Sequence, residues 1–415
     1  MKSPATAIRP RPVVFSATLV ALITVTGANC PSVPAQSRGG ITTQNADENA
    51  RLEYAMQEQY DVIDLSLFED SIHHWQMKDG RDRNDLRYRP DQIVHIAENF
   101  LRFQNDDGGW PANLDWLAMI DVEEIAQIRN GTVGQSTFDN RNIYPQIEYL
   151  SQVFHVTGMQ RYQAAADRGL EYLLQEQRPT GGWRGRDVDA ITFNDDVMVG
   201  IMKLLLRIRE GATHFAWLSP ELQLRLSQSL DRAVDVTLKC QVKVNGRKTA
   251  WCQQHDHLTF MPIKARSFEL PSVTAQESVG VVRFLMEYPD PSDEMIGAID
   301  CAVAWFEAAK IQGLRIDTVP IASVRFEGFT AKFDRRAVHD DLAPPIWARF
   351  YEVDTDRPFF CNRDGEKVFS LSEVELERRV GYRWYGDWPA ELLTQDYPAW
   401  KLRMSSIRTR QDPVD

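Results

Sequence analysis

Cysteine and basic side chains are scarce in this sequence, and its interior has no long apolar run. The 5 cysteines include no Cys-x-x-Cys pair and have no histidine cluster beside them, so a structural zinc site is not expected. The 47 basic side chains are outnumbered by 59 acidic ones, and the net charge of −12 argues against a general nucleic-acid binder. No segment after residue 35 is long and apolar enough to span a bilayer, which excludes a multi-span membrane protein.

The composition is that of a large globular protein. Of the 415 residues, 43% are hydrophobic and 26% are charged, which is enough to bury a sizeable core. These proportions exclude a disordered chain and a collagen-like repeat. The length accommodates one large domain or two domains of medium size.

Residues 1–35 have the pattern of a secretory signal peptide. Three cationic residues precede an apolar stretch, 13–25, which is too short to span a bilayer comfortably. Small residues follow it, with Ala28 and Ala35 as candidate cleavage points. We therefore expect secretion to the periplasm or the extracellular space. Lipoprotein anchoring through Cys30 is the less favoured alternative, because an asparagine precedes that cysteine where a small residue is needed.

Cleavage would make the mature chain more acidic and would leave four cysteines. The removed segment holds three cations and no acids, so the net charge would change from −12 to −15. Residues 36–54 are rich in small polar side chains and read as a flexible linker before one folded domain over 55–405. Cys240 and Cys252 flank an Asn-Gly turn. A small disulfide loop and two free thiols are equal alternatives for this pair.

An internal repeat is the next feature. Three segments share a helix-like stretch, a glutamine and a short polar turn that bears glycine and ends in tryptophan; they run from Gln104 to Trp110, Gln175 to Trp183 and Gln241 to Trp251. The tryptophans recur about every 70 residues, with helical periodicity between them, for example over 197–208. Helix pairs at this period predict an all-α fold, an α/α toroid, rather than a sheet protein. We expect the three tryptophans to be packing residues at the turns rather than sugar platforms.

Polar clusters follow the first two turns. Thr137-Phe138-Asp139-Asn140 follows the first, and Thr192-Phe193-Asn194-Asp195-Asp196 follows the second, each just before a helical run. One interpretation is helix N-capping, in which Asp and Asn accept hydrogen bonds from free amides. The other is a shared site at one end of a toroid, where carboxylate oxygens suit a hard cation such as Ca²⁺.

Further along, the sequence resembles the pectate lyases of polysaccharide lyase family 10. The motifs that carry the resemblance are the Gly-Gly-Trp turns, the Asn-Asp-Asp element, the Ala-Arg-Ser-Phe-Glu-Leu-Pro-Ser run at 265–272, Glu277-Ser278, and the segments 250–256, 347–351, 358–365 and 377–386. Together they cover roughly residues 55–400. The resemblance implies an (α/α)₃ toroid, an incomplete α/α barrel whose irregular loops line a groove. It also implies Ca²⁺-dependent β-elimination of homogalacturonan, with an arginine as the base.

The resemblance also implies roles for individual residues. Arg266 matches the base; Asp139 and Asn140, with Asp195 and Asp196, match the elements that hold Ca²⁺ and Ca²⁺-bridged uronate; Lys264, Arg349 and Arg363 match side chains that grip uronate carboxylates. Because guanidinium normally stays protonated, Arg266 needs neighbouring cations that favour its neutral form. For Arg349 and Arg363, a structural ion pair is the competing interpretation. His255 and Asp256 resemble a catalytic dyad, but a buried, hydrogen-bonded histidine fits better, because uronate elimination needs no nucleophile.

Some loops depart from the family pattern. Arg141 follows Asn140 where relatives continue Gly-Ala-Thr, Ala112 replaces a lysine, and the segment before Ile191 is short and charged. These departures leave open an inactive polyuronate-binding protein. An α/α-barrel glycoside hydrolase with two carboxylates is the enzymatic alternative. The glutamine-tryptophan turns also occur in triterpene cyclases and prenyltransferases, but the acidic or zinc motifs of those enzymes are not evident. We expect a monomer that binds its acidic substrate through a metal, without nucleic-acid or membrane partners.

Overall fold

The structure, a computed structural model, describes residues 40–77, 84–131, 134–327 and 329–411. The predicted signal peptide lies outside these residues. Contacts divide the chain into two units, Met1–Leu52 and Glu53–Asp415, and the description below concerns the second. Helix α1 (Gly40–Gln57) covers most of the segment predicted as a linker. None of the described helices is both long and apolar enough to cross a membrane.

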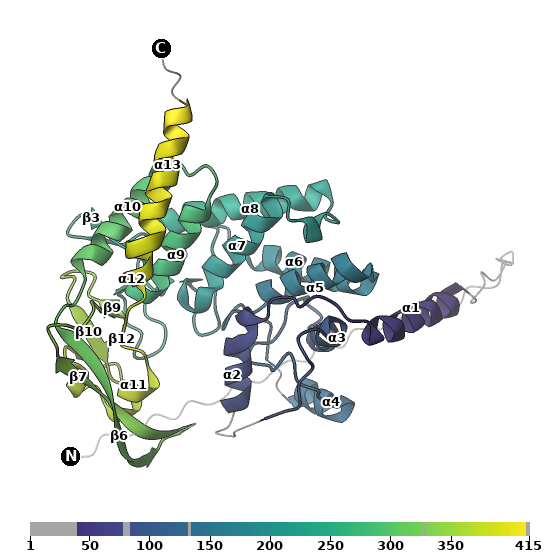
Figure 1. Cartoon of the computed structure of the whole chain (residues 1–415), viewed down its shortest axis with the longest axis horizontal. Helices are drawn as coiled ribbons and strands as arrows, with labels where there is room; N and C mark the ends of the chain where they lie inside the picture. The colour runs from purple at the N-terminus through teal and green to yellow at the C-terminus, as the bar shows by residue number, and fades with distance from the viewer. Residues whose placement is uncertain (1–39, 78–83, 132–133, 328, 412–415) are drawn as a thin grey trace, which may run out of the picture. The chain divides into compact units, whose positions relative to one another are not determined.

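Helices supply most of the regular structure of the second unit (Figure 1). They are α2 (Glu69–Met77), α3 (Ile93–Phe103), α4 (Val122–Gly131), α5 (Tyr144–Thr157), α6 (Gln160–Glu176), α7 (Val197–Arg209), α8 (Pro220–Lys239), α9 (Ala275–Glu287), α10 (Asp293–Ala308), α11 (Leu376–Gly381), α12 (Pro389–Glu391) and α13 (Tyr397–Gln411). The prediction of a mainly helical fold, including the helix over 197–208, is confirmed.

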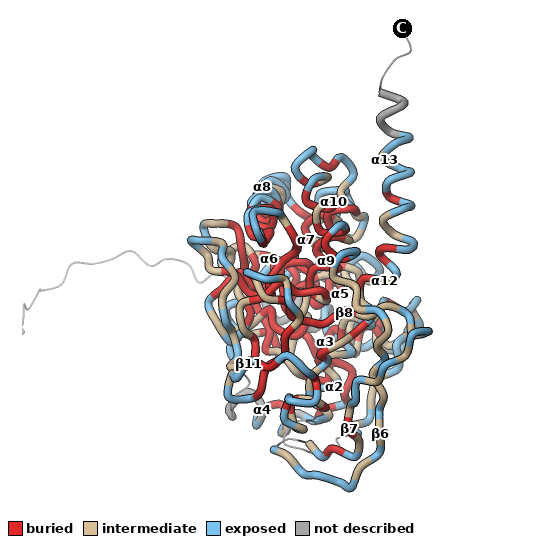
Figure 2. Tube along the Cα trace, turned by 90° about the vertical axis from the view of Figure 1, so that its left-hand side faces the viewer, coloured by how far each residue is buried: buried red, intermediate tan, exposed pale blue. Residues whose placement is uncertain are grey.

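Three consecutive helix pairs form two series. Within the pairs, α5 packs on α6, α7 on α8 and α9 on α10. Between pairs, α3, α5, α7 and α9 contact one another in turn, and so do α6, α8 and α10. The first series is the more buried: α7 and α9 are apolar around most of their surface, whereas α8 is exposed on one face (Figure 2). Burial against neighbours on both sides explains why α7 lacks the polar stripe of a surface helix.

Short strands connect the helices and hold their loops together. β1 (Ile191–Thr192) pairs with β4 (Gln254–His255), β2 (Lys243–Val244) with β3 (Arg247–Lys248), and β8 (Trp347–Ala348) with β12 (Tyr385–Gly386), all antiparallel. A four-stranded sheet has the order β11-β10-β9-β5, from Lys367–Val368, Pro358–Cys361, Phe350–Tyr351 and Val273–Thr274. The prediction of an all-α fold was therefore incomplete, because two-residue strands leave almost no periodic signal in a sequence.

The longest strands form one antiparallel hairpin. β6 (Leu314–Arg325) pairs with β7 (Thr330–His339) from Leu314 opposite His339 to Arg325 opposite Thr330. The register shifts between Pro320 and Val324, where a proline has no N–H to give to the ladder. Most of its residues are exposed or half-buried (Figure 2), so this hairpin adds little to the helical core.

The three repeated turns share one pattern of hydrogen bonds. Each tryptophan is buried and donates its indole N–H to a backbone carbonyl of the preceding helix: Trp110 to Phe100 O at 2.8 Å, Trp183 to Leu173 O at 2.8 Å, and Trp251 to Thr237 O at 2.7 Å. The prediction that the three tryptophans are packing residues is confirmed. A fully buried ring of this size that also satisfies its N–H is a strong anchor for a turn.

A glutamine in each turn joins one helix pair to the next. The amide of Gln104 donates to Gly108 O in its own turn and to Ala165 O in α6, both at 2.8 Å. Gln241 makes the corresponding bonds to Thr249 O and Ala298 O, both at 2.9 Å. In the middle repeat this role belongs to Gln177, at 2.8 Å from Gly181 O and 2.9 Å from Ser229 O. Starting that repeat at Gln175 was therefore wrong by two residues.

The structure also shows whether Cys240 and Cys252 are bonded and what His255 and Asp256 contact. Cys240 and Cys252 are free buried thiols, so the disulfide alternative is not supported. His255 is fully buried; its Nε2 accepts from Cys252 N at 2.9 Å and its Nδ1 lies 2.8 Å from Phe260 O. Asp256 instead accepts the amides of its own turn, at Leu258 and Thr259. The structural role predicted for His255 is confirmed, and the two side chains form no dyad.

Candidate active site

The two polar clusters immediately precede α5 and α7, and both hold consecutive residues in the left-handed region. In the first, Asn140 and Arg141 have φ of 55° and 54°; in the second, Asp195 and Asp196 have φ of 52° and 57°. Neither helix receives a side-chain cap from its cluster, so the N-capping interpretation is wrong. Left-handed non-glycine residues cost roughly 1–2 kcal/mol each and concentrate at functional sites.

The clusters lie together in space although 55 residues separate them. Arg141 Nε donates to Asp196 Oδ2 at 2.8 Å and so joins the first loop to the second. Burial and the negative charge of Asp139 raise the pKa of Asp195 to about 7. The only hydrogen bond to the Asp195 carboxylate among the described residues comes from Asn194 Nδ2, at 2.7 Å. Two carboxylates that repel each other at a poorly compensated position would be stabilised by a cation.

Asp139 is buried and has one weak ionic partner. Burial raises its pKa, and the positive charge of Arg186 partly opposes that rise. Arg186 Nη2 lies 3.5 Å from Asp139 Oδ2 and is itself half-exposed. Beside it, Asn140 Nδ2 donates to Asn113 Oδ1 at 2.6 Å, which leaves the Asn140 amide oxygen available. Carboxylate and amide oxygens such as those of Asp139, Asp195 and Asn140 are the ligand types that Ca²⁺ prefers.

Arg266 faces both carboxylates and is held by a third. Burial raises the pKa of Asp139 and of Asp195, and the positive charge of Arg266 partly opposes both rises, so the three groups interact electrostatically. Burial by itself would lower the pKa of Arg266, but the hydrogen bond and charge of Glu269 outweigh it and the pKa is raised. A second acid, Asp187, lies 3.7 Å from Arg266 Nε. In this state Arg266 is firmly protonated.

Arg349 is part of a buried network rather than an exposed grip. Its Nη2 lies 2.5 Å from Glu277 Oε1 and 3.3 Å from Asn194 Oδ1, and its guanidinium lies 4.5 Å above the Tyr382 ring. Asn194 also donates a hydrogen bond to Asp195, so this buried network helps to position the second cluster. Gln253 Nε2 donates to the same Asn194 oxygen at 2.9 Å. The structural ion pair considered for Arg349 is present.

The two remaining side chains predicted to bind uronate carboxylates, Arg363 and Lys264, are at the surface. Arg363 Nη2 pairs with Glu377 Oε1 at 2.6 Å, and its guanidinium lies 5.1 Å from the Phe268 ring, as does that of Arg266. The structural ion pair considered for Arg363 is therefore also present. Lys264 is exposed, and the described residues offer it no hydrogen bond or ion pair. Of the three side chains predicted to bind uronate carboxylates, Lys264 is the one that has no partner among the residues that the structure describes.

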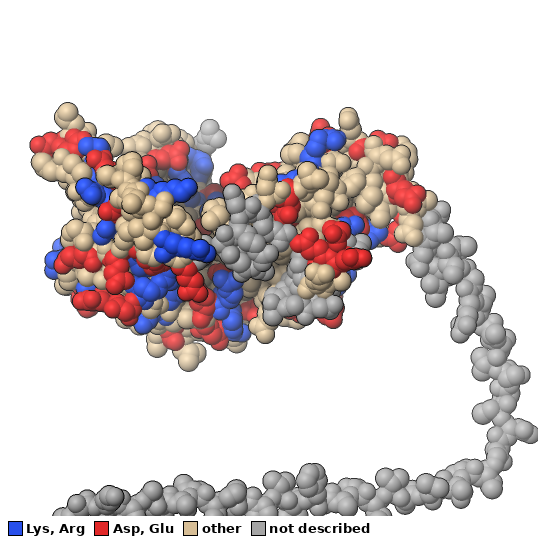
Figure 3. Space-filling view, turned by 90° about the horizontal axis from the view of Figure 1, so that it is seen from below, with Lys and Arg blue, Asp and Glu red and all other residues tan. Residues whose placement is uncertain are grey.

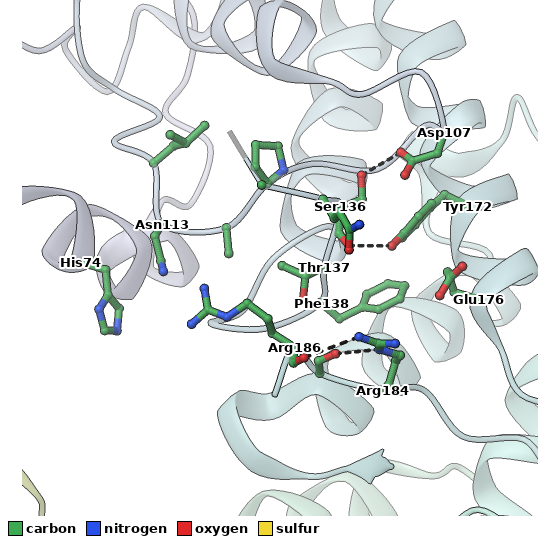
Figure 4. A pocket seen from close by; sticks show the side chains of 16 residues that line it. His74, Asp107, Asn113, Ser136, Thr137, Phe138, Tyr172, Glu176, Arg184 and Arg186 are labelled. Atoms are coloured by element: carbon green, nitrogen blue, oxygen red, sulfur yellow. Dashed lines mark hydrogen bonds between the residues drawn. The ribbon is translucent and has the colours of Figure 1, made fainter. Parts of the chain in front are cut away.

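A large cavity opens beside these residues. Its volume is about 720 Å³, within the range of about 300–1,000 Å³ typical of ligand sites. It is lined by residues from the first turn, the loop before Asp139 and the loop after Trp183, among them Arg184 and Arg186. Figure 4 shows Arg186 extending into it on the side of His74 and Asn113. Because Arg186 also touches Asp139, the cavity adjoins the carboxylate site.

The charged residues in the loops that depart from the family pattern form ion pairs with the predicted site residues. Arg141 pairs with Asp196, Arg186 with Asp139, and Asp187 with Arg266. Sequence reasoning placed these loops near the groove but did not assign the pairs. It also missed Glu269, Glu277 and Asn194 as parts of the site. The only signal for Glu269 and Glu277 was their place inside the quoted motifs, which does not specify a partner.

Within the described residues, no three His, Cys, Asp or Glu side chains gather as a metal-binding group. Asp139 and Asp195 are two carboxylates, and the charges of Asp187 and Glu269 also raise the pKa of Asp139. Asp196 is turned to Arg141 instead. Of the four predicted metal residues Asp139, Asn140, Asp195 and Asp196, only Asp196 has its carboxylate paired with an arginine of the other cluster.

Comparison with known proteins gives three findings. A sequence model of the pectic acid lyase family matches residues 104–393. An aspartate-to-alanine variant of a family 10 polysaccharide lyase from Cellvibrio cellulosa, in complex with trigalacturonic acid, has a TM-score of 0.60 and 29% identity over 72% of this chain and 90% of that one. A further structure of a family 10 polysaccharide lyase from Cellvibrio cellulosa has a TM-score of 0.60 and 27% identity over 80% of this chain and 96% of that one. The search among curated proteins finds no match. With the match spanning most of its length, the chain belongs to the pectic acid lyase family, within polysaccharide lyase family 10, and is a pectate lyase.

Proposed function

We propose that the protein cleaves (1→4)-α-D-galacturonan by Ca²⁺-dependent β-elimination, with Arg266 as the base, and releases 4,5-unsaturated oligogalacturonides. The observation that carries the proposal is that ion pairs bring the acidic loops of two separate repeats together beside Arg266: Arg141 joins the first loop to Asp196, and the adjacent Arg186 and Asp187 contact Asp139 and Arg266. The bound trigalacturonic acid of the similar Cellvibrio structure supports the substrate class.

Asp139, Asp195 and the Asn140 amide oxygen would hold the calcium ion. A bound calcium ion supplies positive charge beside the uronate carboxylate, which makes the proton on the adjacent carbon more acidic. Asp196 has a supporting part in this proposal, because its ion pair with Arg141 fixes the left-handed backbone that presents Asp195. Lys264 would bind a further uronate carboxylate from the surface, and Arg349 and Arg363 would contribute by positioning their loops.

Arg266 would take the proton from C5 of the uronate, and the electron pair of that C–H bond would form the C4–C5 double bond as the glycosidic oxygen leaves. This step requires a neutral fraction of Arg266, whereas Glu269 and Asp187 favour the charged form. Substrate entry would therefore have to weaken at least the longer contact, to Asp187. A base that is hydrogen-bonded in the empty site commonly realigns when substrate binds.

The proposal extends to the architecture and the location of the protein. We propose that the two helix series form an (α/α)₃ toroid, an incomplete barrel whose loops line the cavity beside Asp139. We also propose a catalytic domain over 55–405, a signal peptide over 1–35, secretion without Cys30 anchoring, and a monomer. The two helix series and their repeated glutamine bonds support the architecture, and the sequence pattern of the first 35 residues supports secretion.

A second candidate is a polyuronate-binding protein with little turnover. The ion pairs that Arg186 and Asp187 make with Asp139 and Arg266 favour it, because they neutralise the groups that the reaction needs.

One assay separates the two candidates. Purified protein is incubated with polygalacturonate and Ca²⁺, and the ultraviolet absorbance of unsaturated products is followed, with EDTA as the control. The lyase predicts absorbance that EDTA abolishes and that Arg266→Ala loses while binding persists. Binding without absorbance would support the second candidate, and new reducing ends without absorbance would indicate a hydrolase. Near-normal turnover by Arg266→Ala would exclude Arg266 as the base.

A further inference from the structure

A second, smaller cavity lies beside the β6–β7 hairpin. Its volume is about 200 Å³, and its polar and aromatic wall consists of Arg335 of β7, Arg379 of α11, and Arg383, Thr318, Trp384 and Tyr385. No described residue that lines it carries a carboxylate. Three guanidinium groups on one small cavity are a concentrated positive charge in a protein whose net charge is −12.

Two of the three arginines already have acidic partners, and neither partner lines the cavity. Arg379 pairs with Asp334 through two bonds, at 2.7 and 3.1 Å, and is well buried. Arg383 reaches Asp387 at 3.0 Å, but that aspartate is 73% exposed, so water screens the pair. Arg379 therefore shapes the wall, whereas Arg383, whose guanidinium also lies 5.1 Å from the Trp388 ring, has only a water-screened carboxylate partner.

Arg335 has no carboxylate partner among the described residues. It is half-buried, and its Nη1 donates to the backbone carbonyl of Tyr382 at 2.8 Å. Burial and the nearby charge of Arg383 lower the pKa of Arg335, as expected for a cation that lacks an anion. The position is therefore electrostatically incomplete, and an anion in the cavity would complete it.

We propose that this cavity is a secondary binding site for the carboxylate of a uronate sugar residue. The inference rests on the proposed function, which assigns a polyuronate as the substrate. Arginine donors match a planar carboxylate in geometry, and the half-buried Tyr385 ring offers an apolar face for a sugar. The volume is below the roughly 300–1,000 Å³ of sites for larger ligands, so the cavity suits one sugar unit rather than a stretch of polymer.

The cavity is separate from the catalytic residues but shares a wall with them. The Tyr382 carbonyl accepts from Arg335, whereas its ring lies beneath Arg349 and its hydroxyl donates to Glu269 at 3.3 Å. Trp384 packs on the same ring, with centroids 4.8 Å apart. A second stretch of substrate could therefore be held here without entering the site of Arg266, which would keep the enzyme on the polymer between cleavage events.

The test measures binding of the full-length mature protein in EDTA, where the Ca²⁺-dependent site is silent. Affinity electrophoresis in gels that contain polygalacturonate gives a dissociation constant for wild type and for Arg335→Gln. We expect Arg335→Gln to weaken binding about tenfold, the size of the loss of one charged hydrogen bond. Arg336→Gln is the matched control. It removes the same charge, but Arg336 follows Arg335 on β7 and therefore points to the opposite face of the hairpin.

A second variant and a competition measurement make the binding test decisive. Arg383→Gln, at an exposed position, should also weaken binding, which covers the case in which Arg335→Gln unfolds. Equal binding by wild type, Arg335→Gln and Arg383→Gln would overturn the proposal, and so would equal losses in Arg335→Gln and Arg336→Gln. Competition by inorganic phosphate but not by galacturonate would indicate a general anion site and would also overturn it. Every one of these measurements reports binding in EDTA and none depends on turnover. A protein that shows no lyase activity would therefore contradict the proposed function without contradicting the secondary binding site.

Discussion

Glu269 governs the protonation of Arg266 in this structure, since its hydrogen bond and charge together raise the pKa of that arginine. We expect Glu269→Gln to lower that pKa and to shift the rising alkaline limb of the pH–rate profile about 1 unit lower. The profile is measured as kcat against pH on polygalacturonate with saturating Ca²⁺. Glu377→Gln is the control, because Glu377 pairs with Arg363 and Arg378 instead. An unshifted limb in Glu269→Gln would remove Arg266 from the role of base.

Arg186 occupies the side of Asp139 from which a cation would be attracted. Removing its charge leaves Asp139 and Asp195 with less compensation, so Arg186→Ala should bind Ca²⁺ more tightly. Because Arg186 is 54% exposed, we expect only about a threefold lower half-saturating Ca²⁺. Activity is titrated with Ca²⁺ buffers. Arg184→Ala is the control, because Arg184 lies in the same loop but bonds the backbone oxygens of Gly185 and Arg186 rather than Asp139, and it should leave the titration unchanged. A weaker Ca²⁺ response in Arg186→Ala would show that this side chain assists the site.

His255 makes the fold sensitive to acid. Burial lowers its pKa to about 4. Protonation at Nε2 would also break the hydrogen bond that this atom accepts from Cys252 N. The unfolded chain binds this proton near pH 6.5, so the free energy of unfolding falls as the pH drops from about 6.5 to 4, by about 3 kcal/mol at most. Urea unfolding at stepped pH measures the fall. In His255→Gln this component should vanish, whereas His95→Gln, at a less buried histidine, should retain it.

At the scale of elements, the glycines of the first two repeated turns, Gly108 and Gly181, sit directly against the next helix pair. Gly181 has φ of +107°, and a Cβ there would lie 2.3 Å from the carbonyl oxygen of Arg232. Gly211 also has a positive φ, +79°, but has open space around it. We expect Gly211→Ala to cost about 1 kcal/mol and Gly181→Ala to cost at least about 3 kcal/mol, because only the second also displaces a backbone. Equal urea midpoints for the two variants would contradict the close packing of the turns.

The turns and the buried helices could be predicted from the sequence because their signals are local. A tryptophan after glycines marks a turn, and a continuous apolar run such as 197–208 marks a buried helix. The β6–β7 hairpin was missed although its strands are long, because its solvent-facing residues lack a clear alternation. The site was predicted in outline through its motifs. Its ion pairs were not, because the partner of Arg266 or Asp139 is set by folding across distant loops, and 59 acids offer many choices.

At the scale of the whole molecule, acidic and basic side chains are interspersed on the face shown in Figure 3. With a net charge of −12, the protein should repel a polyuronate at long range. In EDTA, we therefore expect the association rate with polygalacturonate to rise as NaCl shortens the Debye length from about 30 Å at 0.01 M to about 8 Å at 0.15 M. Stopped-flow mixing measures the rate, with a fully methyl-esterified polymer as the uncharged control. A rate that falls with salt would mean that the local arginines dominate the approach.

The repeated glutamines have a consequence for how the chain is assembled and inherited. Gln104, Gln177 and Gln241 each tie a turn only to the adjoining helix pair, so no pair depends on a distant one for these bonds. A chain of nearest-neighbour units can start folding at any one of them and extend in both directions. The same arrangement allows a terminal pair to be gained or lost during evolution while the remaining junctions stay intact.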